Sequence, residues 1–320
     1  MLPPSRALAF SDIPVVDIAA LVGGDESNMA RTVDALSRAC SEVGFFYVSN
    51  HGLPRAALDE LVAQTKAFFS LPLARKEEVA IADSPQFRGY LPLNYKGTGN
   101  KGNNIQEGFL VMPERPTNPR APTHGPNRWP SALPALKPAM TNYFAHANTL
   151  ANRLLRGFSM ALGMGPDGLA SRFSEPMTLL KLNHYPAQDK PEHDLDIGVV
   201  GHTDSGGFTI LWQDDVGGLE VLNKAGEWVV APPIPDTFVI NVGDMMQAWT
   251  NGRFASTLHR VVNRYGTDRY SIPFFMNPNY DVVVEPLLGE APADFKPFVS
   301  GEYTHDIYKR IYPQRSPQPA

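Results

Sequence analysis

Apolar residues recur at helical spacing in two stretches of this chain. Positions three and four apart form one apolar stripe between residues 27 and 43, which predicts an amphipathic helix there. The stripe consists of Val33, Leu36, Ala39, Cys40 and Val43. A longer stripe predicts a helix over residues 132–164, and its members are Leu136, Met140, Phe144, Leu150, Leu154, Leu155, Phe158 and Leu162. A helix of this length with one apolar face is expected to support a sheet.

Shorter apolar runs predict strands and further helices around these two. Residues 13–21 and 45–48 are expected to be strands. Pro54 suits the first turn of a helix that runs to about residue 69, and another short helix begins near residue 71. A last helical stretch, 304–311, is expected to pack across the sheet or over its open side.

From Met177 onward the pattern changes to short strands separated by Gly- and Pro-rich turns. That pattern is typical of an all-β jelly roll, so we expect an α+β protein with a double-stranded β-helix core and supporting helices. Residues 82–138 are dense in Pro, Gly and Asn, which predicts mostly loop with short strands. We expect a division near residue 130 within one compact unit.

The composition narrows the classes of partner. The 320 residues are 43% hydrophobic, enough for one large core or two modest ones. A net charge of -5 without a Lys/Arg cluster predicts no nucleic-acid partner, and no stretch approaches the roughly 20 apolar residues of a membrane span. The single cysteine, Cys40, excludes an intrachain disulfide framework, and the first residues lack the apolar run of a signal peptide. A cytoplasmic protein with no obligate protein partner is expected.

Three residues have the spacing of a facial metal site. His202 and Asp204 are separated by one residue, so one extended strand end could present both side chains to the same ion. His259 follows 55 residues after Asp204, in a segment that predicts another strand, 254–263. Two imidazoles and one carboxylate on one face of an octahedron leave three positions open, which suits Fe(II). Zinc could bind the same ligands, but its chemistry does not need so many vacant positions.

A second group of polar side chains could bind an acid. Alternation along a strand places Arg269 and Ser271 on one face, where they offer a guanidinium fork and a hydroxyl to a carboxylate. Upstream, Asn183 and Tyr185 also lie on one face of a predicted strand and can donate hydrogen bonds. A dicarboxylate could therefore chelate the metal at one end and meet this group at the other.

With these motifs in order, the chain resembles the 2-oxoglutarate and Fe(II)-dependent dioxygenase superfamily, in its isopenicillin N synthase-like branch. The resemblance covers most of the chain. Besides the metal and acid motifs, it rests on residues 13–17, 44–53, 206–221, 241–244 and 250–252. It implies a non-catalytic region with substrate-covering loops over residues 1–130, and the long helix with a catalytic jelly roll over 131–320.

The chemistry follows from the same resemblance. It implies Fe(II) on His202, Asp204 and His259, with 2-oxoglutarate and O2 as co-substrates. The 5-carboxylate of 2-oxoglutarate would meet Arg269 and Ser271, and Tyr185 and Asn183 would complete its pocket. The expected reaction oxidises a small organic molecule, by hydroxylation or by desaturation or cyclisation, and releases succinate and CO2. Protein groups supply the positioning and the metal supplies the redox chemistry.

The substrate-contacting residues are expected in two places. The loop-rich segment covers the open side of the barrel in the resembled family, and it contributes Arg88, Tyr90, Glu107 and Phe109. Its polar run over residues 94–104 belongs to the same expected loop. Apolar residues of the barrel strands, among them Phe208 and Phe275, could wall the cavity, although alternation lets only some of them face inward.

Other functions remain open at this point. An isopenicillin N synthase-like oxidase would use Fe(II) and O2 without 2-oxoglutarate, and it could use Arg269 and Ser271 to hold a substrate carboxylate. More distant alternatives are a non-catalytic or zinc-holding jelly-roll protein and a hydrolase or isomerase on a cupin-like barrel. The substrate, the outcome of the oxidation and the oligomeric state do not follow from the sequence.

Overall fold

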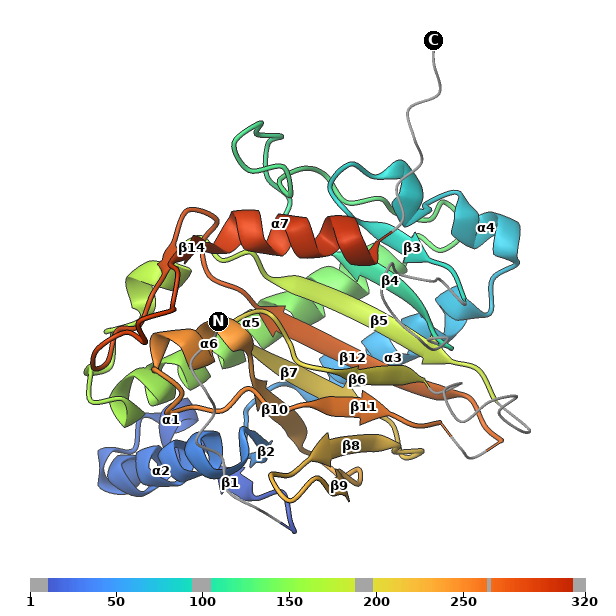
Figure 1. Cartoon of the computed structure of the whole chain (residues 1–320). Helices are drawn as coiled ribbons and strands as arrows, with labels where there is room; N and C mark the ends of the chain where they lie inside the picture. The colour runs from blue at the N-terminus through green and yellow to red at the C-terminus, as the bar shows by residue number, and fades with distance from the viewer. Residues whose placement is uncertain (1–10, 94–104, 188–197, 264–265, 313–320) are drawn as a thin grey trace.

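The computed structural model describes residues 11–93, 105–187, 198–263 and 266–312. An eight-stranded sheet runs through the molecule (Figure 1). Its strands in spatial order are β1 (Val15–Asp17), β2 (Phe45–Ser49), β10 (Phe238–Val242), β7 (Phe208–Gln213), β12 (Arg269–Met276), β5 (Leu179–Tyr185), β4 (Glu107–Val111) and β3 (Gly89–Leu91). Except for the parallel pair of β1 and β2, neighbouring strands are antiparallel.

A smaller sheet faces the central strands of the large one. Its strands in order are β6 (Val199–His202), β11 (His259–Val261), β8 (Leu219–Leu222) and β9 (Trp228–Val230). Between the two sheets lies an apolar core that combines Phe45 and Tyr185 of the large sheet with Val221 and Val261 of the small one. This pair of packed sheets is the predicted jelly roll.

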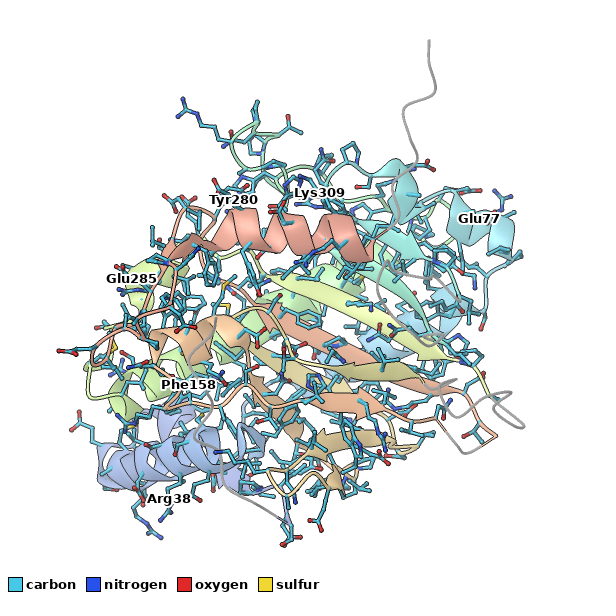
Figure 2. All side chains as sticks on the ribbon, viewed as in Figure 1. Arg38, Glu77, Phe158, Tyr280, Glu285 and Lys309 are labelled. Carbon is cyan, nitrogen blue, oxygen red and sulfur yellow. The ribbon has the colours of Figure 1, made fainter. Side chains whose placement is uncertain are left out.

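Helices cover the other face of the large sheet. They are α1 (Ala19–Gly23), α2 (Glu26–Arg38), α3 (Arg55–Phe69) and the long α5 (Leu136–Ala161). Phe158 of α5 packs edge to face on Phe208 of the sheet, with ring centroids 5.1 Å apart. Figure 2 shows Phe158 inside the molecule and Arg38 at its edge. The predicted supporting helix is therefore present, three to four residues shorter at each end.

Shorter elements close the remaining sides. They are α4 (Leu73–Glu77), two 3₁₀ turns (Ile81–Asp83 and Ala170–Phe173), α6 (Asp244–Trp249), the hairpin strands β13 (Val283–Val284) and β14 (Phe298–Val299), and α7 (Ser300–Ile311). Helix α7 lies along the upper edge of the sheets in Figure 1. Its Tyr308 packs with Phe87 and Leu179 in a separate apolar cluster. None of the helices in the described ranges combines the length and apolar character that a membrane crossing requires.

Two predicted elements are corrected by the structure. The strand expected over residues 13–21 ends at Asp17. The Asp17 carboxylate accepts a hydrogen bond from the N–H of Ala19, and helix α1 begins at Ala19. The helix expected over 27–43 changes after Arg38 into a π-turn, Ala39–Val43, and ends at Gly44. Gly44 has a φ of 77°, and a Cβ there would overlap the carbonyl of Ala255. The chain therefore turns sharply into β2.

The main apolar core draws side chains from both sides of residue 130. Phe46 and Phe68 come from the amino-terminal part, whereas Leu154 and Phe274 come from the remainder. The division into two functional parts stays a prediction, and the predicted loop 94–104 lies outside the described residues.

Candidate functional site

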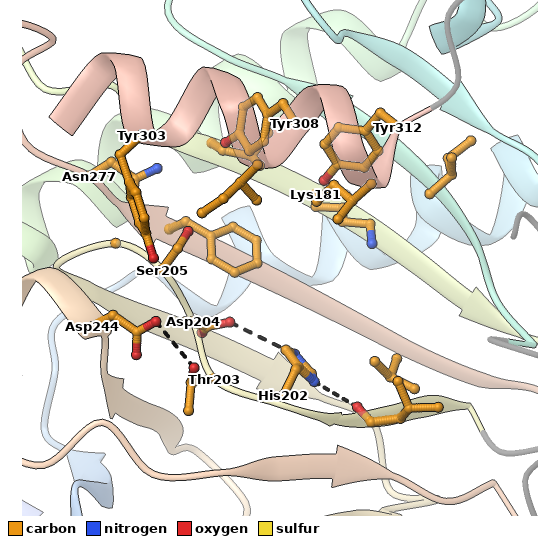
Figure 3. A pocket seen from close by; sticks show the side chains of 18 of the residues that line it. Lys181, His202, Thr203, Asp204, Ser205, Asp244, Asn277, Tyr303, Tyr308 and Tyr312 are labelled. Atoms are coloured by element: carbon orange, nitrogen blue, oxygen red, sulfur yellow. Dashed lines mark hydrogen bonds and ion pairs between the residues drawn. The ribbon is translucent and has the colours of Figure 1, made fainter. Parts of the chain in front are cut away.

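Strand pairing brings the three predicted metal ligands together. In the antiparallel pair of β6 and β11, His202 lies directly opposite His259, and Asp204 follows two residues after the end of β6. One ligand atom from each of the three side chains lies within 4.8 Å of the others. The Nε2 atoms of His202 and His259 are both 3.9 Å from Oδ1 of Asp204. Figure 3 shows His202 and Asp204 directed toward one another.

Backbone carbonyls set the tautomer of both histidines. Nδ1 of His202 lies 2.9 Å from the carbonyl of Val200, and Nδ1 of His259 lies 3.2 Å from the carbonyl of Thr257. A carbonyl can only accept, so each Nδ1 carries the proton and each Nε2 lone pair is directed at the common centre. Burial and the neighbouring His202 lower the pKa of His259 to about 4, so its imidazole is neutral near pH 7. This is the form that binds a metal.

The carboxylate of Asp204 is held by one oxygen and leaves the other for the metal. Its Oδ2 accepts hydrogen bonds from the hydroxyl of Thr209 and, at 2.7 Å, from Nδ2 of Asn241. Burial alone would raise the pKa of Asp204, but the two histidines and these two hydrogen bonds outweigh it and lower that pKa. The group is therefore an anion with Oδ1 facing the imidazoles.

The loop after Asp204 is fixed by the start of α6. The backbone N–H of Asp244 donates to the carbonyl of Asp204 at 2.7 Å, and the N–H of Met245 donates to that of Gly206. The Asp244 carboxylate accepts from the hydroxyls of Thr203 and Ser256. A Cβ at Gly206 would overlap Oδ1 of Asn277, so a larger residue at this position would require the Asn277 side chain to shift.

The predicted acid-binding residues lie in register on neighbouring strands. In the pair of β12 and β5, Arg269 is opposite Tyr185 and Ser271 is opposite Asn183. The guanidinium of Arg269 stacks over the Tyr185 ring, 4.7 Å from its centroid, and its Nε donates to the carbonyl of Gly217. Nδ2 of Asn183 donates to the hydroxyl of Ser271 at 3.3 Å. All four residues line one pocket with the metal triad.

This pocket contains buried polar atoms without partners. Arg269 is fully buried, yet its Nη1 has no hydrogen-bond partner, and the same holds for Oδ1 of Asn183. No carboxylate within the described ranges forms an ion pair with Arg269. Asp214 acts on Arg269 electrostatically but makes no ion-pair contact with it. A buried guanidinium without a direct carboxylate partner is costly, so the pocket fits a ligand carboxylate. The donor set and the unpaired Nη1 together fit Fe(II) and 2-oxoglutarate.

A larger cavity of about 370 Å³ begins at the triad and extends beneath α7. Figure 3 shows Tyr303 and Tyr308 of α7, with Tyr312 just beyond it, above this space, and His202 and Asp204 at its floor. The cavity is half-open and large enough for a small organic molecule. The expected position of the last helix over the open side agrees with this placement.

Lys181 is a site residue that our sequence analysis missed. It lies on β5 two residues before Asn183, so alternation places it on the same strand face as Asn183 and Tyr185. Its side chain lines both the acid-binding pocket and the larger cavity. Burial lowers the pKa of Lys181 to about 8, although the nearby Asp204 acts in the opposite direction. The alternation that identified Asn183 and Tyr185 would also have identified Lys181.

Of the six predicted substrate-contacting residues, only Phe275 lines the cavity within the described part of the chain. Arg88 instead is buried, and its guanidinium donates to the carbonyls of Pro113, Thr123 and Gly125. These hydrogen bonds tie the loop-rich segment together. The interpretation of Arg88 as a substrate contact is therefore corrected.

Tyr90 and Glu107 form a buried polar cluster outside the cavity. The Glu107 carboxylate accepts from the Tyr90 hydroxyl at 2.6 Å and pairs with Lys76 at 2.7 Å and His184 at 2.8 Å. Every oxygen of the carboxylate is thus engaged within the protein. Tyr90 and Glu107 therefore bind other protein side chains and do not line the cavity where a substrate contact was expected.

Phe109 and Phe208 belong to the apolar core. Phe109 packs on Phe68 of α3 with ring centroids 4.7 Å apart, and Phe208 packs on Phe158 of α5. Both side chains are on the helix-covered face of the large sheet. Strand alternation decides this outcome, because residues of one strand face opposite sides in turn.

Comparisons with known proteins agree with this geometry. The family model of the 2OG-Fe(II) oxygenase superfamily matches residues 176–278, and that of the non-haem dioxygenase in morphine synthesis N-terminal region matches residues 13–132. A homoarginine-6-hydroxylase of Glycine max is 36% identical, over 93% of this chain and 96% of its own. An oxoglutarate-dependent flavonoid 7-O-demethylase of Ocimum basilicum is 32% identical, over 96% of this chain and 84% of its own.

Solved structures show the same relationship. A full-length Neurospora crassa protein, crystallised with alpha-KG (2-oxoglutarate) and thymine, superposes with a TM-score of 0.82 at 29% identity, over 93% of this chain and 96% of that one. The family assignment rests on the common fold, on the metal triad and on relatives that match most of their own length. The chain belongs to the 2-oxoglutarate- and Fe(II)-dependent oxygenase superfamily, and it is a non-haem dioxygenase that uses Fe(II), 2-oxoglutarate and O2.

Proposed function

We propose that His202, Asp204 and His259 hold Fe(II), that Arg269, Ser271, Asn183 and Tyr185 hold 2-oxoglutarate, and that the cavity beneath α7 holds the substrate. The observation that carries this proposal is the unpaired Nη1 of the buried Arg269, in the same pocket as the His-Asp-His triad. A cation at one end of the pocket and three metal ligands at the other match the two ends of 2-oxoglutarate.

Each protein group has a defined task in this proposal. When bound, the iron couples decarboxylation of 2-oxoglutarate to oxidation of a C–H bond by O2. Asn241 and Thr209 keep the Asp204 carboxylate oriented with one oxygen toward the imidazoles. Arg269 provides two nitrogens of a charge-assisted fork, one of them unpaired, to the distal carboxylate. The tyrosines of α7 limit the access of water to the cavity.

The substrate is a small organic molecule in this proposal. Relatives are named for homoarginine and for a flavonoid, and the Neurospora crassa protein was crystallised with thymine, so this fold accepts substrates of quite different chemistry. The cavity volume of about 370 Å³ suits molecules of that size. No nucleic-acid or protein partner is needed to complete the site as we propose it.

An anaerobic titration tests the assignment of these residues. We expect the protein with Fe(II) to develop a weak visible charge-transfer band when 2-oxoglutarate is added, and to release succinate slowly on exposure to O2. Replacing His202, Asp204 or His259 with Ala should abolish the band while the melting temperature of the metal-free protein stays close to that of the wild type. Full activity in any of the three variants would refute the triad. Iron binding without the band would favour an oxidase that takes its electrons from the substrate.

A further inference from the structure

Lys181 lies where the co-substrate pocket meets the substrate cavity. On β5, Lys181 lies two residues before Asn183, on the same strand face as Asn183 and Tyr185. It borders the pocket that contains Arg269 and also the cavity beneath Tyr308 and Tyr312. Figure 3 shows its side chain between Tyr312 above and His202 below.

The ammonium group of Lys181 forms no hydrogen bond or ion pair with any residue in the described ranges. Lys181 is only 9% exposed, and the carboxylate of Asp204 acts on its charge without a direct contact. Two carboxylates line the same cavity, and both are engaged. Asp204 belongs to the metal triad, and Asp244 accepts hydrogen bonds from Thr203 and Ser256.

A buried lysine of this kind is stabilised by an anion that enters from the cavity. Burying an ammonium without a partner is unfavourable, and a bound carboxylate offsets that cost through a charge-assisted hydrogen bond. The cavity that Lys181 borders is lined in part by apolar side chains, among them Leu179, Phe275 and Ile307, and also by Gln106 and the tyrosines Tyr303, Tyr308 and Tyr312. The site therefore combines one cation with apolar and aromatic surface, which suits an organic acid with a hydrocarbon or aromatic body.

We propose that Lys181 binds a carboxylate of the primary substrate, so that the substrates of this enzyme are small organic acids. The proposal rests on the proposed function, because it assumes that the cavity beneath α7 is the substrate site. It assigns Lys181 a separate task from Arg269, which holds the distal carboxylate of 2-oxoglutarate.

Matched sets of probes test this assignment. The panel consists of alkanoic and arylalkanoic acids, each with its primary amide and its amine of equal length; one set is 3-phenylpropionate, 3-phenylpropanamide and 3-phenylpropylamine. Binding to the full-length protein is measured by calorimetry, once with Fe(II) and 2-oxoglutarate under anaerobic conditions and once with the metal-free protein. The variants are K181M, K181R and the control K309M, whose lysine is exposed on the outer side of α7 (Figure 2).

We expect acids of the panel to bind in preference to their amides and amines. K181M should weaken the best acid about 30-fold or more, because a buried charge pair is lost. K181R should retain most of the affinity, and K309M should behave like the wild type. Preferential binding of amines or amides, a complete lack of acid selectivity, or acid binding that is unaffected by K181M would overturn the proposal.

Three outcomes separate this proposal from the one it rests on. If K181M weakened 2-oxoglutarate as strongly as the acid, Lys181 would belong to the co-substrate site and the proposal would be wrong. If the charge-transfer band failed to form while the metal-free protein still bound acids through Lys181, the proposed function would fail and the acid site would stand. If the band formed without acid selectivity, only the assignment of Lys181 would fail.

Discussion

Replacing Arg269 with Ala should remove the discrimination between 2-oxoglutarate and a 2-oxo acid that lacks the distal carboxylate. The guanidinium is fully buried and has an unpaired Nη1, so its contact with a carboxylate is shielded from water. Losing one partner of a buried charge pair costs roughly 2 to 5 kcal/mol, which corresponds to a roughly 30-fold to several thousand-fold weaker affinity.

The truncation also disturbs the protein itself. The variant loses the hydrogen bond from Nε to the Gly217 carbonyl and the stacking on Tyr185, so a weaker affinity for 2-oxoglutarate alone would be ambiguous. A comparison of two ligands resolves this. 2-Oxopentanoate has the chelating end of 2-oxoglutarate but no second carboxylate, and it therefore reports the structural damage alone.

The assay is an anaerobic titration of the Fe(II) protein with each ligand, followed by the visible charge-transfer band. The wild type should bind 2-oxoglutarate at least about 30-fold more tightly than 2-oxopentanoate. In R269A the two affinities should become nearly equal, and R269K should lie between the two proteins because it keeps the charge but not the fork. If R269A weakened both ligands by the same factor, the reasoning would be refuted and the distal carboxylate would bind elsewhere.

Three further predictions follow from the fold and the triad. N241A removes a hydrogen bond from Asp204 and should weaken Fe(II) binding about 10- to 100-fold in a competitive metal titration; unchanged affinity would contradict the orienting role of Asn241. The pKa of His259 is about 4 in the folded protein and about 6.5 in the unfolded chain, so between these pH values the unfolded chain binds more protons. The metal-free protein therefore loses about 3 kcal/mol of stability as the pH falls from about 6.5 to about 4. Urea denaturation at several pH values should show this loss in the wild type and a smaller one in H259Q, whereas parallel curves would count against it. F158A should lower the free energy of unfolding by about 3 to 5 kcal/mol, and a loss below about 1 kcal/mol would mean that the ring does not anchor α5 on the sheet.

Strand alternation explains why so much of the site could be predicted from the sequence. Residues two apart share a face of a strand, so Asn183 with Tyr185 and Arg269 with Ser271 could be grouped before the sheet was known. What the sequence could not supply is the pairing that sets Arg269 opposite Tyr185 and His202 opposite His259. Such registers depend on contacts between distant segments, which local patterns do not contain.

In the loop-rich segment, local sequence patterns do not predict which side chains face a ligand. Its polar residues have no periodicity, so nothing local distinguishes a side chain that faces a ligand from one that is buried with protein partners. The position of Arg88 is decided by three backbone carbonyls 25 to 37 residues further along the chain. The expected strand at 13–21 failed for a related reason, because the hydrogen bond from Ala19 to Asp17 favours a helical turn over a longer strand.

Strand β5 contributes side chains both to the pocket beside the metal triad and to the buried cluster around Glu107. One face carries Asn183 and Tyr185 toward the proposed co-substrate pocket, whereas His184, between them, pairs with the buried carboxylate of Glu107, which Lys76 also binds. The amino-terminal region is thereby bonded to the same strand that, in our proposal, positions 2-oxoglutarate. An exchange of this region between related enzymes, made to transfer a substrate preference, would therefore also alter co-substrate affinity unless Lys76, Glu107 and His184 were moved together.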